Sequence, residues 1–288
     1  MGTESRLKAE LKRLALGAAS SAGVAGADIL SSSVPQLENY IARGLPPGLG
    51  WLARAPRRRA DIRSFFPKAR SVLMCAFCYG GPPPAPLSPG ELERITATRG
   101  GRNLPLKKAF ASLPSVNAAR YFLLRDYHAA VKAALEGVLA KLRENHPETE
   151  GRVFCDDSPV LEKALAVKAG LGWVGKNTLL ITPRRGSFVV LGGIALSCEL
   201  GPDTPCATGG CGRCENCLRA CPSGALEPYV LNPARCASYW TTLHKGELPP
   251  GAAEICGQRA AGCDICQDAC PFNAGTSAAV SAVFEAVR

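Results

Sequence analysis

The chain has 288 residues, a formal net charge of +10 and 47% hydrophobic residues, which suits one large or two smaller folded domains and excludes a disordered protein. No apolar run reaches the roughly 20 residues that a membrane helix needs, and the N-terminus lacks a signal-peptide pattern, so we expect a cytoplasmic protein with no membrane association. In a reducing cytosol, 14 cysteines with close spacing more often bind metal or do chemistry than form disulfides.

The first half of the chain contains patterns of helices and one strand. Leucines at helical spacing in residues 1–16 predict a short amphipathic helix. Residues 69–79 predict a buried strand, and the proline-rich stretch 82–89 predicts an irregular loop. Apolar residues on one helical face then predict a long helix over roughly 118–145.

A second helix is expected over about 159–169, with Ser158 as its N-cap and Gly170 at its end. Two apolar stretches follow, 178–182 and 187–196, and the turn between them favours a hairpin. No dinucleotide-binding fingerprint and no phosphate-binding loop occurs in this half of the chain.

From about residue 200 the composition shifts to glycine, proline and cysteine, so we expect a domain boundary there. This gives domains over 1–200 and 201–275, followed by a tail over 276–288. Apart from two cysteine motifs, the sequence has no internal repeat.

The two cysteine motifs are typical of ferredoxins that hold two [4Fe–4S] clusters. The first is Cys211-x2-Cys214-x2-Cys217-x3-Cys221-Pro222, and the second is Cys236 followed at a distance by Cys263-x2-Cys266-x3-Cys270-Pro271. In such pairs the fourth cysteine of each run binds the other cluster. We therefore expect one cluster on Cys211, Cys214, Cys217 and Cys270, and the other on Cys221, Cys236, Cys263 and Cys266.

The alternative for these motifs is structural zinc. Zinc sites usually pair two C-x2-C units rather than two runs that each end in Cys-Pro, so iron–sulfur is the favoured interpretation. Six cysteines remain outside the motifs: Cys75, Cys78, Cys155, Cys198, Cys206 and Cys256. The pair Cys75-x2-Cys78 lies in a hydrophobic strand pattern and is interpreted as buried apolar residues rather than a redox pair.

At this point the sequence resembles epoxyqueuosine reductase. The resemblance covers residues from about 20 to 275. It is carried by ARYFLLRDYH (119–128), CDDSP (155–159), KAGLGWVGKNTLLI (168–181), GSFVVLGGI (186–194), RCASYWT (235–241) and the two cysteine motifs.

The resemblance implies an α+β architecture in which a nitroreductase-like cobalamin-binding domain is followed by a ferredoxin-like domain with two clusters, as in the related reductive dehalogenases. It implies an oxidoreductase that uses cobalamin and two [4Fe–4S] clusters to reduce epoxyqueuosine in tRNA to queuosine. The expected partners are tRNA and an electron donor of flavodoxin or ferredoxin type. An electron carrier that docks onto another protein, or a cobalamin-dependent reductase of a small molecule, are the alternatives.

The family's proton donor lies in an Asp-x-x-Pro motif, which here is Asp156 followed by Pro159. This chain departs from the pattern by having Asp157 where a small hydroxyl residue is usual. From the residues alone, the favoured interpretation is that both aspartates simply lie near the N-terminus of the expected helix, where negative charge is favoured, and the resemblance reverses this preference. Asp126 is the alternative acid, although it could also pair with the neighbouring Arg125.

For cobalamin, the resemblance implies contacts from six positions: Tyr79, Arg120, Asp156, Leu180, Leu191 and Ser238. Lys176, Asn177 and Thr178 either contact the corrin amides or cap a turn. His128 is interpreted as a hydrogen-bonded helix residue and not as a cobalt ligand.

The basic excess lies partly in the runs 57–59, 107–108 and 184–185, which are either solvated surface or contacts to nucleic acid. The resemblance differs at the C-terminus, because many family members continue into a helical-repeat extension that helps to hold tRNA and this sequence ends at Arg288. We therefore expect either that the catalytic core binds RNA through its own basic surface or that the substrate differs.

Overall fold

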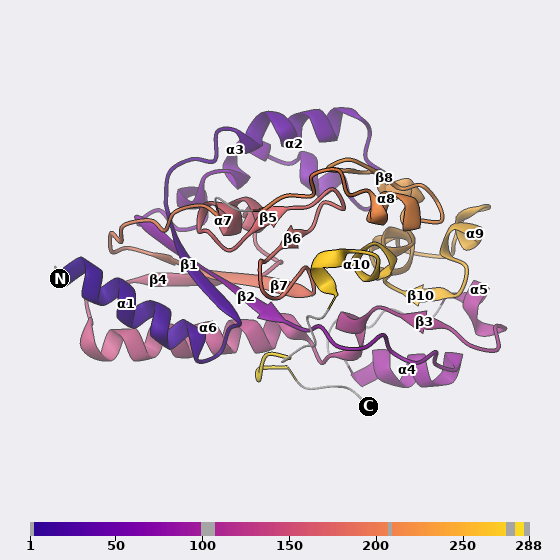
Figure 1. The fold of residues 1–288 in the computed structure, drawn as a ribbon, viewed down its shortest axis with the longest axis horizontal. Helices are drawn as coiled ribbons and strands as arrows, with labels where there is room; N and C mark the ends of the chain where they lie inside the picture. The colour runs from indigo at the N-terminus through magenta and orange to yellow at the C-terminus, as the bar shows by residue number, and fades with distance from the viewer. Residues whose placement is uncertain (1–2, 99–106, 207–208, 275–279, 285–288) are drawn as a thin grey trace.

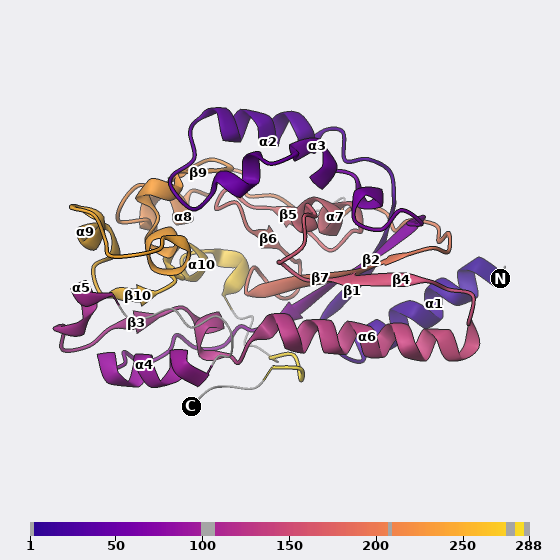
Figure 2. The same ribbon diagram turned by 180° about the vertical axis from the view of Figure 1, so that it is seen from behind.

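The computed structural model describes residues 3–98, 107–206, 209–274 and 280–284, and its elements are labelled in Figures 1 and 2. The α-helices are α1 (Thr3–Leu16), α2 (Ser33–Ala42), α3 (Pro56–Arg59), α4 (Pro89–Thr98), α5 (Lys108–Ala111), α6 (Tyr127–Asn145), α7 (Glu162–Lys168), α8 (Asn216–Ala220), α9 (Ala252–Cys256) and α10 (Ile265–Asp268). The strands are β1 (Ser21–Gly26), β2 (Ser71–Cys78), β3 (Asn117–Ala118), β4 (Gly151–Phe154), β5 (Trp173–Val174), β6 (Leu180–Ile181), β7 (Val189–Leu196), β8 (Leu226–Glu227), β9 (Val230–Leu231) and β10 (Arg259–Ala261).

A four-stranded sheet with the order β1-β2-β7-β4 forms the centre of the larger lobe. Every neighbouring pair in it is antiparallel. β2 is buried along its whole length because helices cover both faces of the sheet. Its side chains alternate between the two faces, as the pleat of a strand requires.

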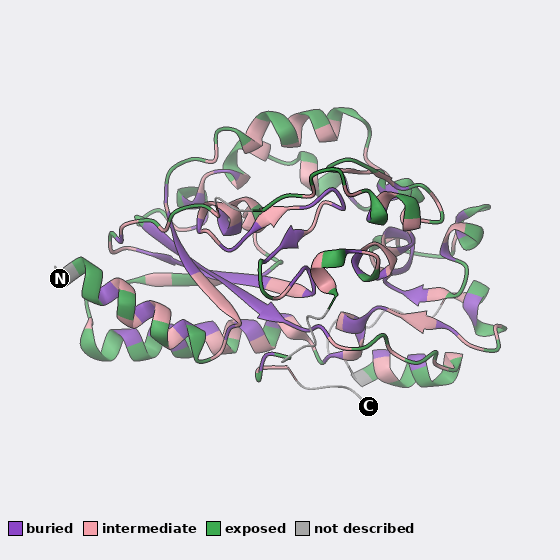
Figure 3. Ribbon diagram, viewed as in Figure 1, coloured by how far each residue is buried: buried purple, intermediate pink, exposed green. Residues whose placement is uncertain are grey.

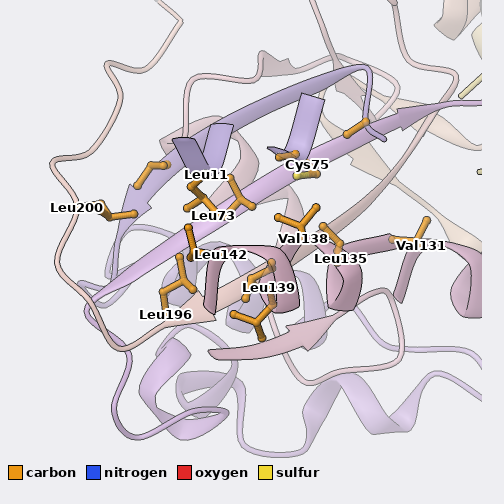
Figure 4. Packing of buried hydrophobic residues seen from close by; sticks show 14 of the residues in the cluster. Leu11, Leu73, Cys75, Val131, Leu135, Val138, Leu139, Leu142, Leu196 and Leu200 are labelled. Carbon is orange, nitrogen blue, oxygen red and sulfur yellow. The ribbon is translucent and has the colours of Figure 1, made fainter. Parts of the chain in front are cut away.

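On one face, α1 and α6 pack against the sheet (Figures 1 and 4). Leu11 of α1 and Leu135 and Leu139 of α6 meet Leu73 of β2 there. On the other face, Leu165 of α7 packs in a second cluster with the alternate residues of β2. The sheet is thus the middle layer of three.

Two glycines in β7 let neighbouring side chains approach the strand closely. A Cβ atom on Gly193 would lie 2.4 Å from the Phe154 ring and 2.7 Å from the Leu73 carbonyl oxygen. A Cβ atom on Gly192 would lie 2.6 Å from Val131 of α6. The close packing of α6 and β4 on this strand therefore requires glycine, which has no side chain, at these two positions.

The cysteine motifs lie in a second lobe, beside the end of the sheet (Figure 1). Its core is shared with residues from the first half of the chain, since Trp240 and Ala261 pack in one cluster with Phe110 and Phe122. β10 also pairs in parallel with β3. Figure 3 shows the buried residues continuing from the sheet into this lobe.

Two further contacts join distant parts of the chain. Asp203 accepts a hydrogen bond from the backbone nitrogen of Val24 at 2.9 Å and pairs with Lys8 and Lys12, each at 2.7 Å. Ser281 pairs with the end of β2, because its backbone nitrogen donates to the Cys78 carbonyl oxygen at 2.8 Å. Among the described residues, no helix is long and apolar enough to cross a membrane.

The N-terminal helix, the buried strand and the irregular proline-rich loop are confirmed. The helix expected over 118–145 is wrong at its start, because α6 begins at Tyr127. The preceding residues form β3 and a 3-10 turn, η3 (Arg120–Leu123). Asp126 ends that irregular stretch and caps α6 by accepting a hydrogen bond from the His128 backbone nitrogen at 3.1 Å.

The expected N-cap at Ser158 is wrong as well, since α7 begins at Glu162 and Leu161, which makes no capping hydrogen bond, occupies the N-cap position. The expected end is confirmed by Gly170, whose φ of +76° is the conformation that glycine supplies after a helix. The hairpin is wrong apart from one bridge between Thr182 and Gly186. β6 pairs with β5, and β7 enters the main sheet between β2 and β4.

Candidate functional site

Four cysteines from both motifs line one small cavity in the second lobe. They are Cys211, Cys214, Cys217 and Cys270. Lys176 and Asn177, from the turn between β5 and β6, line the same cavity. The backbone nitrogen of Lys176 donates to the Cys211 sulfur at 3.3 Å. The structure thus brings together the four cysteines expected for one cluster.

The other four motif cysteines also influence one another electrostatically. Burial raises the pKa of the Cys266 thiol, and the charges of Cys263, Cys236 and Cys221, together with Cys217 of the first group, raise it further. Burial likewise raises the pKa of Cys263 to about 11. Burial also raises the pKa of Cys236, whereas hydrogen bonds with Ser223 and Ala225 outweigh burial and lower the pKa of Cys221. A metal cluster would compensate the charges of these thiolates, because metal binding releases thiol protons.

None of the 14 cysteines, which all lie in the described ranges, forms a disulfide bond, and those outside the motifs are mostly interior residues. Cys75 and Cys78 are buried in β2, as expected for apolar core residues. Within the described ranges, no group of three or more histidine, cysteine or acidic side chains is placed to hold a single metal ion.

Lys176 is a buried cation beside the first group of cysteines. Its Nζ donates to the carbonyl oxygens of Gly212 and Cys214, both at 3.0 Å, and the residue is 9% exposed. Within the part of the chain that the structure describes, no carboxylate forms an ion pair with it. Its side chain therefore faces the cysteine cavity, while the neighbouring Asn177 caps the turn by accepting a hydrogen bond from the Leu179 backbone nitrogen at 3.3 Å.

Asp156 lies in a small polar network at the other end of the site. Tyr127 Oη donates to Asp156 Oδ2 at 2.6 Å, and His128 Nε2 lies 3.2 Å from the same oxygen. His128 Nδ1 lies 2.7 Å from Asp126 Oδ1. The histidine, only 6% exposed, therefore connects the two candidate acids. The Asp156 side chain is 57% exposed, so it can reach a bound molecule.

The loop that carries Asp156, residues 155–161, has an unusual backbone. Asp156 has a φ of +55°, in the left-handed region that favours glycine. Its backbone nitrogen donates to Glu162 Oε1 at 2.5 Å. Because α7 starts only at Glu162, Asp156 lies outside the first turn of that helix, and the helix-terminus explanation for its charge is wrong.

A row of aromatic rings links this network to the cysteine lobe. Tyr121 lies between Tyr127 and Tyr79, with ring centroids 6.3 Å from each. The Tyr79 hydroxyl is 3.5 Å from Gln267 Nε2, next to Cys266. Tyr79 is buried, and burial together with the negative charge of nearby Asp264 raises its pKa. Its hydroxyl is therefore neutral.

Arg120 has a structural position between the two lobes. It pairs with Asp264 at 3.0 Å and Asp268 at 2.7 Å, and its guanidinium lies 4.2 Å from the Phe188 ring centroid. Because Arg120 is 8% exposed, these contacts account for its charge.

The three remaining expected cobalamin contacts lie in two places. Leu180 and Leu191 lie in the core cluster under α7, and the Leu191 carbonyl oxygen accepts from the Cys155 sulfhydryl at 3.2 Å. Ser238 precedes the π-helix η5 (Tyr239–Leu243) in the cysteine lobe. The structure therefore brings Tyr79 and Arg120 together around Phe188, and it brings Leu191 next to the Asp156 loop.

Sequence analysis did not identify Tyr121, Tyr127, Glu162 or Gln267 as parts of the site. Tyr127 and Tyr121 lie within the ARYFLLRDYH segment, which is one of the segments that resemble the family and so indicated a functional region. Glu162 carried no such signal, because its contact depends on the positive φ of Asp156.

Two family models match the chain, one over part of the sheet lobe and one over the cysteine motifs. Residues 59–157 match the family model described as epoxyqueuosine reductase QueG, DUF1730. Residues 210–273 match the model of a 4Fe–4S double cluster binding domain. The second match establishes a C-terminal double-cluster domain within a mixed α+β fold.

Whole-chain relatives agree as well. The chain is 33% identical to the epoxyqueuosine reductase of Cyclobacterium marinum over 87% of its own length and 74% of the relative. A structure of the Bacillus subtilis epoxyqueuosine reductase, in which a catalytic aspartate loop is swung out of the active site, matches 96% of this chain and 68% of that one, with a TM-score of 0.77 and 27% identity.

A further epoxyqueuosine reductase structure, with a tRNA-Tyr stem loop modified with epoxyqueuosine, matches 98% of this chain and 69% of that one. The TM-score is 0.75 and the identity is 26%. The family matches, the whole-chain relative and the paired cysteine motifs lead to one conclusion: the chain belongs to the epoxyqueuosine reductase family.

Proposed function

We propose that this protein reduces epoxyqueuosine to queuosine in tRNA, with two [4Fe–4S] clusters and cobalamin as cofactors. The relatives named epoxyqueuosine reductase and the structure of one with a modified tRNA stem loop support this substrate. The observation that carries the proposal is that one fold contains both the paired cysteine motifs and the partly exposed Asp156, and connects them. A row of aromatic rings connects the cysteine lobe to a partly exposed carboxylate.

The cysteines fit two clusters with exchanged fourth ligands. One cluster would be held by the cavity cysteines Cys211, Cys214, Cys217 and Cys270, and the other by Cys221, Cys236, Cys263 and Cys266. Tyr127, which contacts Asp156, and the neighbouring Tyr121 are both partly exposed, so their rings would offer apolar surface to a bound corrin, whereas Tyr79 is buried. When bound, the clusters carry single electrons and cobalamin supplies a strongly reducing cobalt centre that no side chain can replace.

In this account the sheet lobe is the nitroreductase-like cobalamin domain and the cysteine lobe is the ferredoxin-like domain. We place the first over 1–200 and the second over 201–275, with a tail over 276–288. Tyr79, Arg120, Leu180, Leu191 and Ser238 are the proposed cobalamin positions besides Asp156. An electron donor of flavodoxin or ferredoxin type would reduce the clusters.

The protein's own residues would supply the proton that the epoxide oxygen needs. Asp156, held by Tyr127 Oη, gives a proton to the epoxide oxygen as the carbon–oxygen bond breaks. His128 faces the same carboxylate through Nε2 and is oriented by Asp126 at Nδ1. It is therefore placed to return a proton to Asp156. By the likeness to the Bacillus subtilis enzyme, we propose that the Asp156 loop also moves.

A basic surface beside this loop suits the tRNA backbone. Arg57 and Arg58 of α3 are exposed. The Arg59 carbonyl oxygen accepts from the backbone nitrogen of Leu161 at 3.3 Å, which places α3 next to the Asp156 loop. Arginines at such a position can neutralise phosphates near the site of reaction. We propose that this run, rather than the one at 107–108, contacts tRNA, because Lys107 Nζ donates to the carbonyl oxygens of His244 and Gly246.

Substitution of Asp156 tests the proposed acid. Asp156→Asn keeps the size and polarity of the side chain, so both clusters and cobalamin should still bind. Turnover should fall by about 10²–10⁴-fold, the usual contribution of general acid catalysis. Mass spectrometry of nucleosides from digested tRNA measures the product.

Asp126→Asn is the matched control. It retains an oxygen that can cap α6 and hold His128, so it should reduce turnover less than Asp156→Asn. Normal turnover of Asp156→Asn combined with an inactive Asp126→Asn or Asp157→Asn would move the role of acid to the other carboxylate.

A further inference from the structure

Trp51 is an aromatic residue that the fold presents to solvent. It lies in the 3-10 helix η1 (Gly50–Ala53), which has about three residues per turn. Leu49 and Leu52 therefore lie on the same side of this turn, and both pack against the core cluster that contains Trp240. Trp51 lies on another side and is 43% exposed. The two leucines thus anchor the turn and leave the indole outside the core.

Two contacts from Arg59, at the end of α3, hold Trp51 in this position. Arg59 Cζ lies 5.0 Å from the centroid of the indole ring, and Arg59 Nη2 donates to the Trp51 carbonyl oxygen at 2.9 Å. A guanidinium at this distance from an indole makes a cation–π interaction. The Arg59 carbonyl oxygen also accepts from Leu161 in the Asp156 loop. A single residue therefore connects the exposed indole to the loop that carries the proposed acid.

The surface around the indole is basic. Residues 50–59 contain four arginines and no acidic residue. Arg54, Arg57 and Arg58 are exposed. Glu38 of α2 faces the run at 3.6 Å from Arg57 Nε, and such an exposed pair contributes little to stability, so another anion can replace it. The indole thus lies in a surface that attracts anions.

A fixed aromatic ring among exposed arginines suits an unpaired nucleotide. Proteins bind single-stranded RNA by contacting phosphates with cations and by stacking bases on aromatic rings. For the proposed reaction, the modified base must leave its neighbours in the stem loop to reach Asp156. A neighbouring base then loses a stacking partner, which a ring next to the Asp156 loop can replace. The positive charge and this position favour RNA over a protein partner.

We propose that Trp51 stacks on an unpaired base next to the modified nucleotide of the tRNA, while Arg57 and Arg58 contact phosphates close to that base. This rests on the proposed function and assigns the recognition of the loop to a particular residue. A base pair within a helix does not offer its face to an outside ring. Trp51 would therefore favour the stem loop over duplex RNA.

Binding of RNA to the cluster-loaded and cobalamin-loaded protein tests this contact. The probes are a tRNA-Tyr stem loop that carries epoxyqueuosine and a blunt RNA duplex of the same length, each labelled for fluorescence anisotropy. Trp51→Leu keeps an apolar side chain and removes the aromatic face, whereas Trp51→Phe keeps such a face. Leu16→Ala, at the exposed end of α1, is the control for the loss of apolar surface elsewhere.

Trp51→Leu should weaken binding of the stem loop about 5–150-fold, the range that one base-stacking contact contributes. Trp51→Phe should recover most of this loss, and Leu16→Ala should bind as the unsubstituted protein does. Binding of the duplex should stay unchanged in all three variants. In turnover assays Trp51→Leu should raise KM more than it lowers kcat.

The salt dependence separates stacking from charge. Stacking releases no counterions, so the slope of log affinity against log salt should be the same in Trp51→Leu as in the unsubstituted protein. Replacing Arg57 and Arg58 by glutamine should make the slope shallower, because fewer phosphates are then neutralised. Photo-cross-linking with 5-iodouridine at the unpaired positions, followed by peptide mass spectrometry, should locate the base at Trp51.

Unchanged binding of the stem loop by Trp51→Leu, or an equal loss for stem loop and duplex, would overturn the proposal. Weaker binding of a flavodoxin by Trp51→Leu, with RNA binding intact, would assign this surface to the electron donor instead. The proposed function fails separately, through loaded protein that leaves epoxyqueuosine unchanged. Loss of stem-loop binding in Trp51→Leu without any conversion by the unsubstituted protein would keep Trp51 as an RNA contact and remove the reaction.

Discussion

Lys176 connects the turn after β5 to the cysteine motifs. From the sequence its charge had two explanations, a contact to the corrin amides or a turn cap. The structure buries it against the cavity of Cys211 and Cys214. A buried cation without a carboxylate partner in the described chain needs some other negative charge. Four cluster-bound thiolates would supply that charge.

Lys176→Met tests this relation. Removing a positive charge beside a cluster disfavours its more negative reduced state, so the midpoint potential of one cluster should become more negative. A shift of about 59 mV corresponds to a tenfold change in the one-electron equilibrium. A redox titration followed by electron paramagnetic resonance measures it. Lys141→Met, exposed on α6, should leave both potentials in place, and an equal shift in both variants would exclude a local effect of Lys176.

For individual residues, the sequence predicted a role only where the residue belongs to a recognisable motif. The eight cysteines and Asp156 were identified in this way, and the structure places four of those cysteines around one cavity. Glu162 and Tyr121 could not be found by spacing. Their contacts arise from a left-handed backbone at Asp156 and from ring packing between separate segments.

Among the elements, β7 best shows what local patterns miss. Its apolar run was recognised as a strand, but a neighbouring stretch and a turn suggested a hairpin partner. Its actual partners are β2, more than a hundred residues earlier in the chain, and β4. Nothing in the local pattern distinguishes these partners, because the choice depends on burying both faces of the strand under α6 and α7.

Gly193→Ala tests how tightly β7 is packed. The new methyl group would meet the Phe154 ring and the Leu73 carbonyl oxygen, and the latter cannot move without disturbing β2. We expect a loss of about 1–3 kcal/mol in the free energy of unfolding, as for other overpacked cores. Chemical denaturation of the protein measures it.

Gly137→Ala is the control for the same chemical change. Gly137 lies in α6 and has no atom within 4 Å of its added Cβ, so this substitution should stabilise the helix by roughly 0.5–1 kcal/mol. Equal stability changes in the two variants would contradict the close approach at Gly193.

On the scale of the whole molecule, the two lobes depend on one another. Phe110 and Phe122 from the first half of the chain complete the core of the cysteine lobe, and β3 pairs with β10. Arg120 joins Asp264 and Asp268 across the same junction. The change of composition near residue 200 was visible in the sequence, but this shared core was not, because it is built from residues far apart in the chain.

This junction brings Gln267, next to Cys266 of the cysteine lobe, and the Asp156 network to opposite ends of one aromatic row. Electron supply and proton supply would thus reach a single substrate from two sides. The central claim is that these parts act together on epoxyqueuosine in tRNA.

The most direct test is to incubate the anaerobically reconstituted protein with tRNA that contains epoxyqueuosine, with and without cobalamin, in the presence of a low-potential reductant. Mass spectrometry of the digested nucleosides then measures queuosine. The account predicts conversion that requires cobalamin and is lost when Cys270 of the cavity is replaced by serine. Fully loaded protein that leaves epoxyqueuosine unchanged, or that converts it equally well without cobalamin, would contradict it.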